Sequence, residues 1–357
     1  MMKGRHRLAL ALCFARPSLS LEWAVCLHAS DVRHDRALTV RALQQIARLG
    51  ATLVRTDFDW ADFQPEGAHA WSNATVRYFE EYVADAGALG VQLVMILSHP
   101  PQWAWDLYAS ADVDGFLAAY EAYAAKMGAL YGARVKYVQY WNEPNNLNDQ
   151  IAAADRWRLF LAADRGVRQA VAAPRGMVNY DADSIYRLGW LPQLREAFAR
   201  IGAAEPQHTI RTIALDVYPS TWSLPSSLGG WRPLAALHRA LADPSHPCYG
   251  FDAALTETGY SQFFSPASWF RRSQQWQAEW FSRELPQLLR IIQQFHLQQA
   301  KSRYLFVGLY ELYDKESSKT IDPEAYFGLY LSDMRTEKLA VSAIRSVINS
   351  STAMEFA

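Results

Sequence analysis

The chain has 357 residues, of which 50% are hydrophobic and 13% aromatic, and its formal net charge is −1. Because the charge is near zero and no long run of like charge occurs, neither nucleic acid nor an anionic membrane is expected as the main partner. No linker rich in Gly, Pro or Ser divides the chain. One folded domain is therefore predicted over residues 21–350, with a leader at 1–20 and a tail at 351–357.

The predicted leader has a mixed pattern. A basic stretch at 1–7 precedes an apolar stretch at 8–15, as in a secretory signal. No clean cleavage site follows, and Arg16-Pro17 interrupts the pattern, so a degenerate signal and a plain leader both stay open. A periplasmic or secreted location would follow from the first, and a cytoplasmic location from the second. No later stretch is long and apolar enough to span a bilayer.

From residue 21 onward, strand-like and helix-like segments alternate. Apolar runs such as VQLVMILS are typical of parallel strands that are buried on both faces. Strands are predicted at residues 21–28, 51–58, 91–98, 135–141, 171–178, 212–219, 251–257 and 304–310. Helices are predicted at residues 39–50, 72–90, 114–132, 154–172, 189–201, 231–243, 270–298 and 337–348. Pro286 is expected to kink or divide the helix at 270–298.

Strict alternation of strands and helices predicts a parallel sheet with helical crossovers. Eight such units in one chain favour closure into a (β/α)8 TIM barrel, a single α/β domain, over an open doubly wound sheet. Active sites in this architecture lie at the C-terminal ends of the strands. Residues at the ends of the predicted strands are therefore the first candidates for function.

Two of the predicted strands lead to a glutamate. The run VKYVQYWNEPN contains Glu143 after the fourth strand, and DAALTETGY contains Glu257 at the end of the seventh. Hydrolysis of a glycosidic bond uses such a pair, because one carboxyl protonates the leaving oxygen while the other attacks or stabilises the anomeric carbon. Alone, Asn-Glu-Pro is also an ordinary exit from a strand. In a retaining reaction the two carboxyls are expected about 5–5.5 Å apart.

Several motifs resemble those of clan A glycoside hydrolases, and in particular those of family 39-like glycosidases, including exopolysaccharide-associated ones. WNEPN at 141–145 is similar to the strand-four signature, and LTETGY around Glu257 is similar to the strand-seven segment. The remaining similarities are VRTDFDWADFQP with Arg55, HPPQWA at 99–104, DVYP at 216–219 and FGLYLSDMRTEKLA at 327–340. The resemblance covers about residues 21–350.

This resemblance implies a role for each matching residue. Glu143 would be the acid/base, Glu257 the nucleophile, and Asn142 a ligand of the sugar 2-hydroxyl. Arg55 and the hydroxyl of Tyr218 would both hydrogen-bond the nucleophile. From the residues alone, Arg55 is also open to a structural ion pair with the aspartate at position 57 or 59.

Other side chains near strand ends are predicted to bind or support a substrate, since aromatic faces pack on sugar rings. These candidates are His99, Trp103, Tyr310 and Trp60. The alternatives are a structural histidine and aromatic side chains packed in the core or in loops. Many clan members have a Trp at the end of strand eight, where this chain has Tyr310 followed by Glu311, so the floor of the sugar site departs from the pattern.

No metal or cofactor is predicted. The three cysteines, Cys13, Cys26 and Cys248, form neither a disulfide framework nor a CxxC pair. The nine histidines show no HExxH, and the GxGxxG, P-loop and GxSxG motifs are missing from the sequence.

The sequence thus predicts a retaining hydrolase of a β-linked glycoside or polysaccharide, with carbohydrate as its partner. One alternative is a catalytically weak barrel that binds carbohydrate in a polysaccharide assembly or secretion system. Another is a lyase or aldolase with a Schiff-base lysine, although none of the seven lysines lies at a predicted strand end. The sugar, the linkage, endo or exo action, transglycosylation and the oligomeric state stay open at this level.

Overall fold

The computed structural model describes residues 21–33, 35–146, 151–182, 189–222, 225–262, 273–299, 301–315 and 322–353. The predicted leader at 1–20 and the last residues of the predicted tail, 354–357, lie outside this part of the chain. Within the described residues, no helix combines the length and the apolar character that a bilayer span requires.

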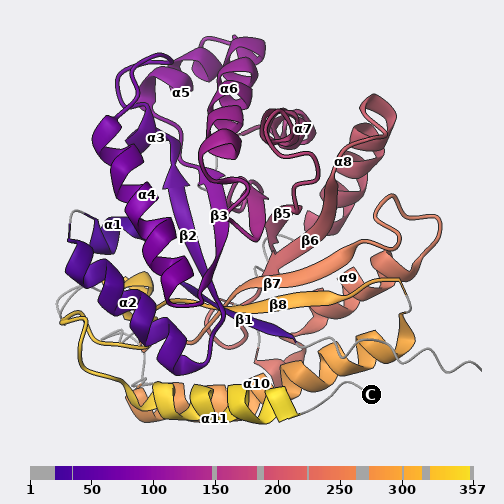
Figure 1. Cartoon of the computed structure of the whole chain (residues 1–357). Helices are drawn as coiled ribbons and strands as arrows, with labels where there is room; N and C mark the ends of the chain where they lie inside the picture. Colours follow the sequence, from indigo (N-terminus) through magenta and orange to yellow (C-terminus); the bar gives the residue numbers. More distant parts are fainter. Residues whose placement is uncertain are drawn as a thin grey trace, which may run out of the picture.

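Eight parallel strands close into a barrel in chain order, with β1 paired to β8, as Figure 1 shows. The strands are β1 (Glu22–Cys26), β2 (Leu53–Asp59), β3 (Gln92–Ser98), β4 (Tyr137–Tyr140), β5 (Gly176–Asp181), β6 (Ile210–Asp216), β7 (Asp252–Thr258) and β8 (Tyr304–Leu309). The predicted (β/α)8 TIM barrel is therefore confirmed.

The predicted helices surround this barrel, and α10 and α11 lie side by side on its outer face (Figure 1). They are α2 (Arg36–Leu49), α4 (Asn73–Ala88), α6 (Val113–Tyr131), α7 (Arg156–Arg168), α8 (Trp190–Ala204), α9 (Arg232–Ala242), α10 (Gln274–Gln298) and α11 (Leu339–Ala353). Short helices were not predicted, because three to eight residues are too few for a periodic pattern. They are α1 (Ala29–Val32), α3 (Trp60–Phe63), α5 (Gln102–Ala109), η1 (Ser226–Leu228) and η2 (Pro323–Tyr326).

Several element ends differ from the prediction by a few residues, and strand β5 and helix α10 are the two differences that matter most. Strand β5 was expected at 171–178 but spans Gly176–Asp181. The predicted range included Pro174, which has no backbone N–H to donate to a neighbouring strand and lies before the observed strand. The shift brings Asn179 and Asp181 to the C-terminal end of the barrel. Pro286 does not divide α10, which continues through it as one helix of 25 residues.

Inside the barrel, each strand contributes one residue to a buried apolar layer. Its members are Ala24, Leu53, Val94, Tyr137, Met177, Ala214, Ala254 and Phe306. Side chains alternate between the two faces of a strand, so the residue two positions later also points inward, one layer closer to the C-terminal ends. That second layer is mostly polar and consists of Cys26, Arg55, Ile96, Gln139, Asn179, Asp216, Thr256 and Gly308. The alternation thus stacks polar groups directly on an apolar floor.

The helix pair α6 and α7 packs closely through glycines. A Cβ added at Gly166 would fall on the Glu121 carbonyl oxygen and within 2.9 Å of the Ala124 Cβ. A Cβ added at Gly87, in the exposed part of α4, would meet no atom within 4 Å.

We therefore expect opposite effects from two equal substitutions. Gly166→Ala should lower the free energy of unfolding by about 1–3 kcal/mol, because it overpacks the interface. Gly87→Ala should raise it by roughly 0.5–1 kcal/mol, because alanine favours the helix and meets no obstacle. Urea unfolding of both variants measures the difference, and equal changes would show that α6 and α7 do not pack as closely as described.

Candidate active site

Glu257, on β7, is held by two side chains at both of its oxygens. Arg55 on β2 donates from Nη1 to Glu257 Oε1 at 2.5 Å, and the hydroxyl of Tyr218, just after β6, donates to Oε2. Glu257 is 6% exposed and Arg55 is 2% exposed, so this ion pair is buried. A buried carboxylate with partners on both oxygens is fixed in orientation as well as in charge.

The guanidinium of Arg55 has further partners on β4 and just after it. Its Nε donates to Gln139 Oε1 at 2.9 Å, and its Nη2 donates to Asn142 Oδ1 at 2.6 Å. The two neighbouring aspartates contact other groups: Asp57 contacts His28 at 2.6 Å, and Asp59 contacts His99. Arg55 therefore serves Glu257 and Asn142 rather than a local ion pair with these aspartates.

Glu143 lies just beyond β4, in a loop whose backbone is unusual. Its φ is 41° and that of Trp141 is 73°, in the left-handed region that non-glycine residues rarely adopt. The backbone N–H of Glu143 donates to Asn179 Oδ1 at 2.8 Å, and its Oε2 accepts from Asn146 Nδ2 at 2.8 Å. Burial, followed by the negative charge of Glu257, raises the pKa of Glu143 to about 7.

A third carboxyl group, Asp216 at the end of β6, completes the cluster. It is fully buried, and Asn179 Nδ2 and Thr256 Oγ1 each lie 2.6 Å from one of its oxygens. Glu143, Asp216 and Glu257 each present an oxygen within 4.8 Å of the other two. Within the described part of the chain, the site is therefore a triad of carboxyl groups in which the guanidinium of Arg55 contacts Glu257.

Sequence reasoning gave no role to Asn179 or Asp216. Strand β5 was predicted to end at residue 178, one position before Asn179. Asp216 lies in the DVYP segment, where only the tyrosine was singled out. The signal that identifies both is their spacing, because each follows a residue of the apolar layer by two positions.

Two groups of side chains among the described residues are close enough to hold a metal ion. The first is Asp57, Asp59 and His99, and the second is the carboxyl triad. In the first group each aspartate already faces a histidine. In the second, both oxygens of Glu257 are engaged by Arg55 and Tyr218. We assign no ion to either group.

Tyr310 follows β8 and packs edge-on against Tyr218, with the ring centroids 5.8 Å apart. Its hydroxyl lies 3.0 Å from Lys315 Nζ and 3.1 Å from Glu324 Oε2. The adjacent Glu311 is buried and contacts His28 at 3.3 Å. A charged network thus occupies the position where a tryptophan is common in the clan, beside the partner of Glu257.

His99 and the tryptophans have different surroundings. His99 is exposed and borders a pocket of about 370 Å³ that also reaches Trp105, Trp141 and Glu143. Trp103 is half-buried and donates from Nε1 to Gln64 O at 2.7 Å. Trp60 is fully buried in an aromatic cluster, so for this residue the packing alternative holds and contact with a substrate does not.

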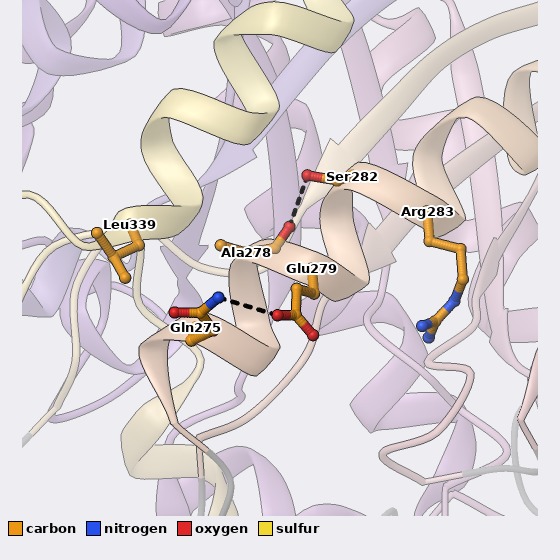
Figure 2. Close-up of a pocket in the computed structure, with 6 residues that line it drawn as sticks. All are labelled: Gln275, Ala278, Glu279, Ser282, Arg283 and Leu339. Atoms are coloured by element: carbon orange, nitrogen blue, oxygen red, sulfur yellow. Dashed lines mark hydrogen bonds between the residues drawn. The ribbon is translucent and has the colours of Figure 1, made fainter.

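A second pocket, of about 340 Å³, lies along α10 beside the start of α11 and is drawn in Figure 2. It is lined by Gln275, Ala278, Glu279, Ser282, Arg283 and Leu339. The hydrogen bonds there, from Gln275 to Glu279 and from Ser282 to the Ala278 carbonyl, stay within one helix (Figure 2). Its polar groups are thus engaged locally and do not converge on a ligand.

No protein-family model and no curated protein matches this sequence. Solved structures do match over nearly the whole chain. A family 1 β-glucosidase from Thermotoga maritima has a TM-score of 0.68 at 14% identity, over 94% of this chain and 98% of that one. A family 39 glycoside hydrolase from Bacteroides cellulosilyticus WH2 has a TM-score of 0.66 at 14% identity, over 92% of this chain and 64% of that one.

An exo-β-1,4-mannosidase from Opitutaceae bacterium strain TAV5 has a TM-score of 0.64 at 15% identity, over 96% of this chain and 63% of that one. The chain thus spans just under two thirds of the family 39 enzyme and of the mannosidase. At these identities the likeness is one of fold. The resemblance inferred from the motifs therefore extends to the architecture, and the barrel of this chain is similar to those of family 39 and family 1 glycoside hydrolases.

Proposed function

We propose that the protein is a retaining glycoside hydrolase that cleaves a β-linked glycoside or polysaccharide by double displacement. The observation that carries the proposal is the approach of Glu143 and Glu257, which have oxygens within 4.8 Å of each other at the C-terminal ends of the strands. Retaining enzymes have carboxyls about 5–5.5 Å apart, whereas inverting enzymes need about 6.5–9.5 Å to admit a water between them. The short separation favours retention.

In the first step, Glu257 attacks the anomeric carbon while Glu143 protonates the leaving oxygen. Arg55 and Tyr218 suit this step, because they contact both oxygens of Glu257 and hold the carboxyl group in a fixed orientation. Glu143 suits it as well, since a pKa of about 7 leaves a large protonated fraction at neutral pH. Asn142 has its oxygen engaged by Arg55, so its NH2 group is the part assigned to the sugar 2-hydroxyl.

In the second step, water attacks the glycosyl ester and gives a proton to Glu143, which now acts as a base. The ester removes the negative charge of Glu257, so the pKa of Glu143 falls and its carboxylate form becomes available. The anomeric carbon is inverted twice and keeps its configuration. A sugar hydroxyl in place of water would give transglycosylation through the same ester.

The pocket beside Glu143 supports carbohydrate as the substrate. Its volume of about 370 Å³ lies within the usual range for small-molecule sites, roughly 300–1,000 Å³. Trp105 and Trp141 supply aromatic surface, and His99 and Asn146 supply hydrogen-bonding groups. Apolar faces with a few polar groups match the alternating C–H and O–H surface of a pyranose.

The alternatives receive less support. A barrel that only binds carbohydrate has no need for three carboxyl groups with oxygens within 4.8 Å of one another, which cost stability to bury. For a Schiff-base enzyme, the candidate among the described lysines is Lys315, whose Nζ lies 3.0 Å from the Tyr310 hydroxyl beside the site. Burial lowers the pKa of Lys315, but Glu311 and Glu324 outweigh it and leave the pKa raised, so the amine is protonated. Turnover of aryl β-glycosides separates the hydrolase from a binding barrel.

The two glutamates should differ in chemical rescue. Glu257→Ala should abolish turnover, because no glycosyl ester can form. Glu143→Ala should lose about 10²–10⁴-fold with poor leaving groups and much less with activated aryl glycosides, which need little protonation. Azide should partly restore the second variant and yield a β-glycosyl azide, identified by proton NMR. Equal losses on every substrate, with no effect of azide, would contradict the assigned roles.

The charge of Glu257 should be visible in the titration of Glu143. Glu257→Gln removes a negative charge that disfavours ionisation of Glu143, so the pKa of Glu143 should fall below about 7. Carbon NMR of protein labelled at the glutamate carboxyl carbon measures this without turnover, with Glu143→Gln to assign the signal. An unchanged or higher pKa would mean that the two carboxyls do not sense each other.

A further inference from the structure

Asp216 is a buried carboxyl group that the proposed reaction does not use. It lies between the strand that carries Glu257 and the strand that carries Asn179, and none of its surface is exposed. Its oxygens face two hydrogen-bond donors, Thr256 Oγ1 and Asn179 Nδ2, each at 2.6 Å. The orientation of Asn179 is set by its own oxygen, which accepts the backbone N–H of Glu143. Asp216 is therefore built into the support of Glu143.

The charges around Asp216 do not balance if every carboxyl is ionised. The ionisable groups that act on it or on which it acts come from several strands: Cys26, Arg55, Glu143, Tyr218 and Glu257. Only Arg55 among them is a cation, and its Nη1 contacts Glu257 at 2.5 Å. Burial, then the charges of Glu257 and Glu143, raise the pKa of Asp216 well above its ordinary value, although Arg55 and Thr256 act the other way.

Asp216 and Glu143 present side-chain oxygens within 4.8 Å of each other, which brings a hydrogen bond between them within reach. Two carboxylates cannot form one without a proton, because ionised carboxyls only accept hydrogen bonds. Glu143 gives up and regains its own proton during the reaction, so the proton that links the pair is assigned to Asp216, which Thr256 and Asn179 hold in place.

We propose that Asp216 is a positioning residue, a neutral carboxylic acid whose hydroxyl donates a hydrogen bond to Glu143. The inference rests on the proposed function and adds a step-by-step role. When Glu143 gives its proton to the leaving oxygen, the hydroxyl of Asp216 stabilises the carboxylate that remains. When water is deprotonated, Glu143 takes that proton and Asp216 keeps its own. Asp216 thus holds Glu143 in place through both steps without exchanging a proton with the substrate.

The variant Asp216→Asn tests whether Asp216 is a neutral carboxylic acid or an ionised carboxylate in the resting enzyme. The amide keeps the shape, a donor and an acceptor but cannot ionise. If Asp216 is neutral, the substitution changes no charge, and the pKa of Glu143 should stay within about 0.5 unit of the native value. If it is ionised, its removal relieves repulsion, and the pKa of Glu143 should drop as in Glu257→Gln. Carbon NMR of the carboxyl-labelled resting enzyme decides between these outcomes, with Glu257→Gln as the matched control.

Turnover of the Asp216 variants provides a second test beside the NMR titration. Asp216→Asn should retain kcat/KM within roughly threefold, whereas Asp216→Ala should lose about 10- to 100-fold with poor leaving groups and far less with activated ones, part of what a general acid supplies. A purely structural role would reduce both substrate classes equally and would overturn the proposal. If Asp216→Ala does not fold, the asparagine variant still decides. The NMR arm needs no activity, so failure of the hydrolase proposal is distinguishable from failure of this one.

Discussion

The buried guanidinium of Arg55 is the interaction on which the site depends. It reaches across the barrel from β2 and donates to Glu257 on β7 and to Gln139 and Asn142 at β4. A buried charge is tolerated only where its partners replace the water that it loses. Here the planar fork of arginine supplies separate hydrogen bonds in fixed directions, which a lysine could not do. Removing Arg55 would take away the cation that contacts Glu257 and leave three carboxyl groups with oxygens within 4.8 Å of one another.

The apolar part of the barrel supports this concentration of buried charge. Its apolar layer contains a residue from every strand and closes the interior beneath the polar layer. The polar groups above that floor are paired with one another, as Asp216 is with Asn179 and Thr256. The strained backbone at Trp141 and Glu143 lies at the same end, where such strain is characteristic of functional sites. The apolar layer that stabilises the barrel thus lies beneath the polar layer, and the carboxyl groups proposed to react lie at the C-terminal ends of the strands.

Much of this arrangement follows from sequence patterns. The alternation of elements predicts the barrel, and a residue at a strand end reaches the mouth even if the boundary is misplaced by one or two positions, as for Glu143 and Glu257. Other features depend on exact register. Asn179 was missed because strand β5 was predicted too early in the chain. The burial of Trp60 was missed because this residue begins the short helix α3, which is too short to show a periodic pattern in the sequence. Which carboxyl group carries a proton depends on the distances between side chains in the folded protein, and a sequence pattern does not contain these distances.

The central claim is that Glu257 forms a covalent ester with the sugar. Activated 2-deoxy-2-fluoro-β-glycosides of glucose, mannose, galactose and xylose test it, because the fluorine slows breakdown of the ester more than its formation is slowed with a good leaving group. We expect the intact mass to rise by one fluorosugar with the cognate probe, and peptide mapping to locate the label on Glu257. A label on another residue, or no adduct with the fluorinated form of a glycoside that the enzyme hydrolyses, would contradict the account.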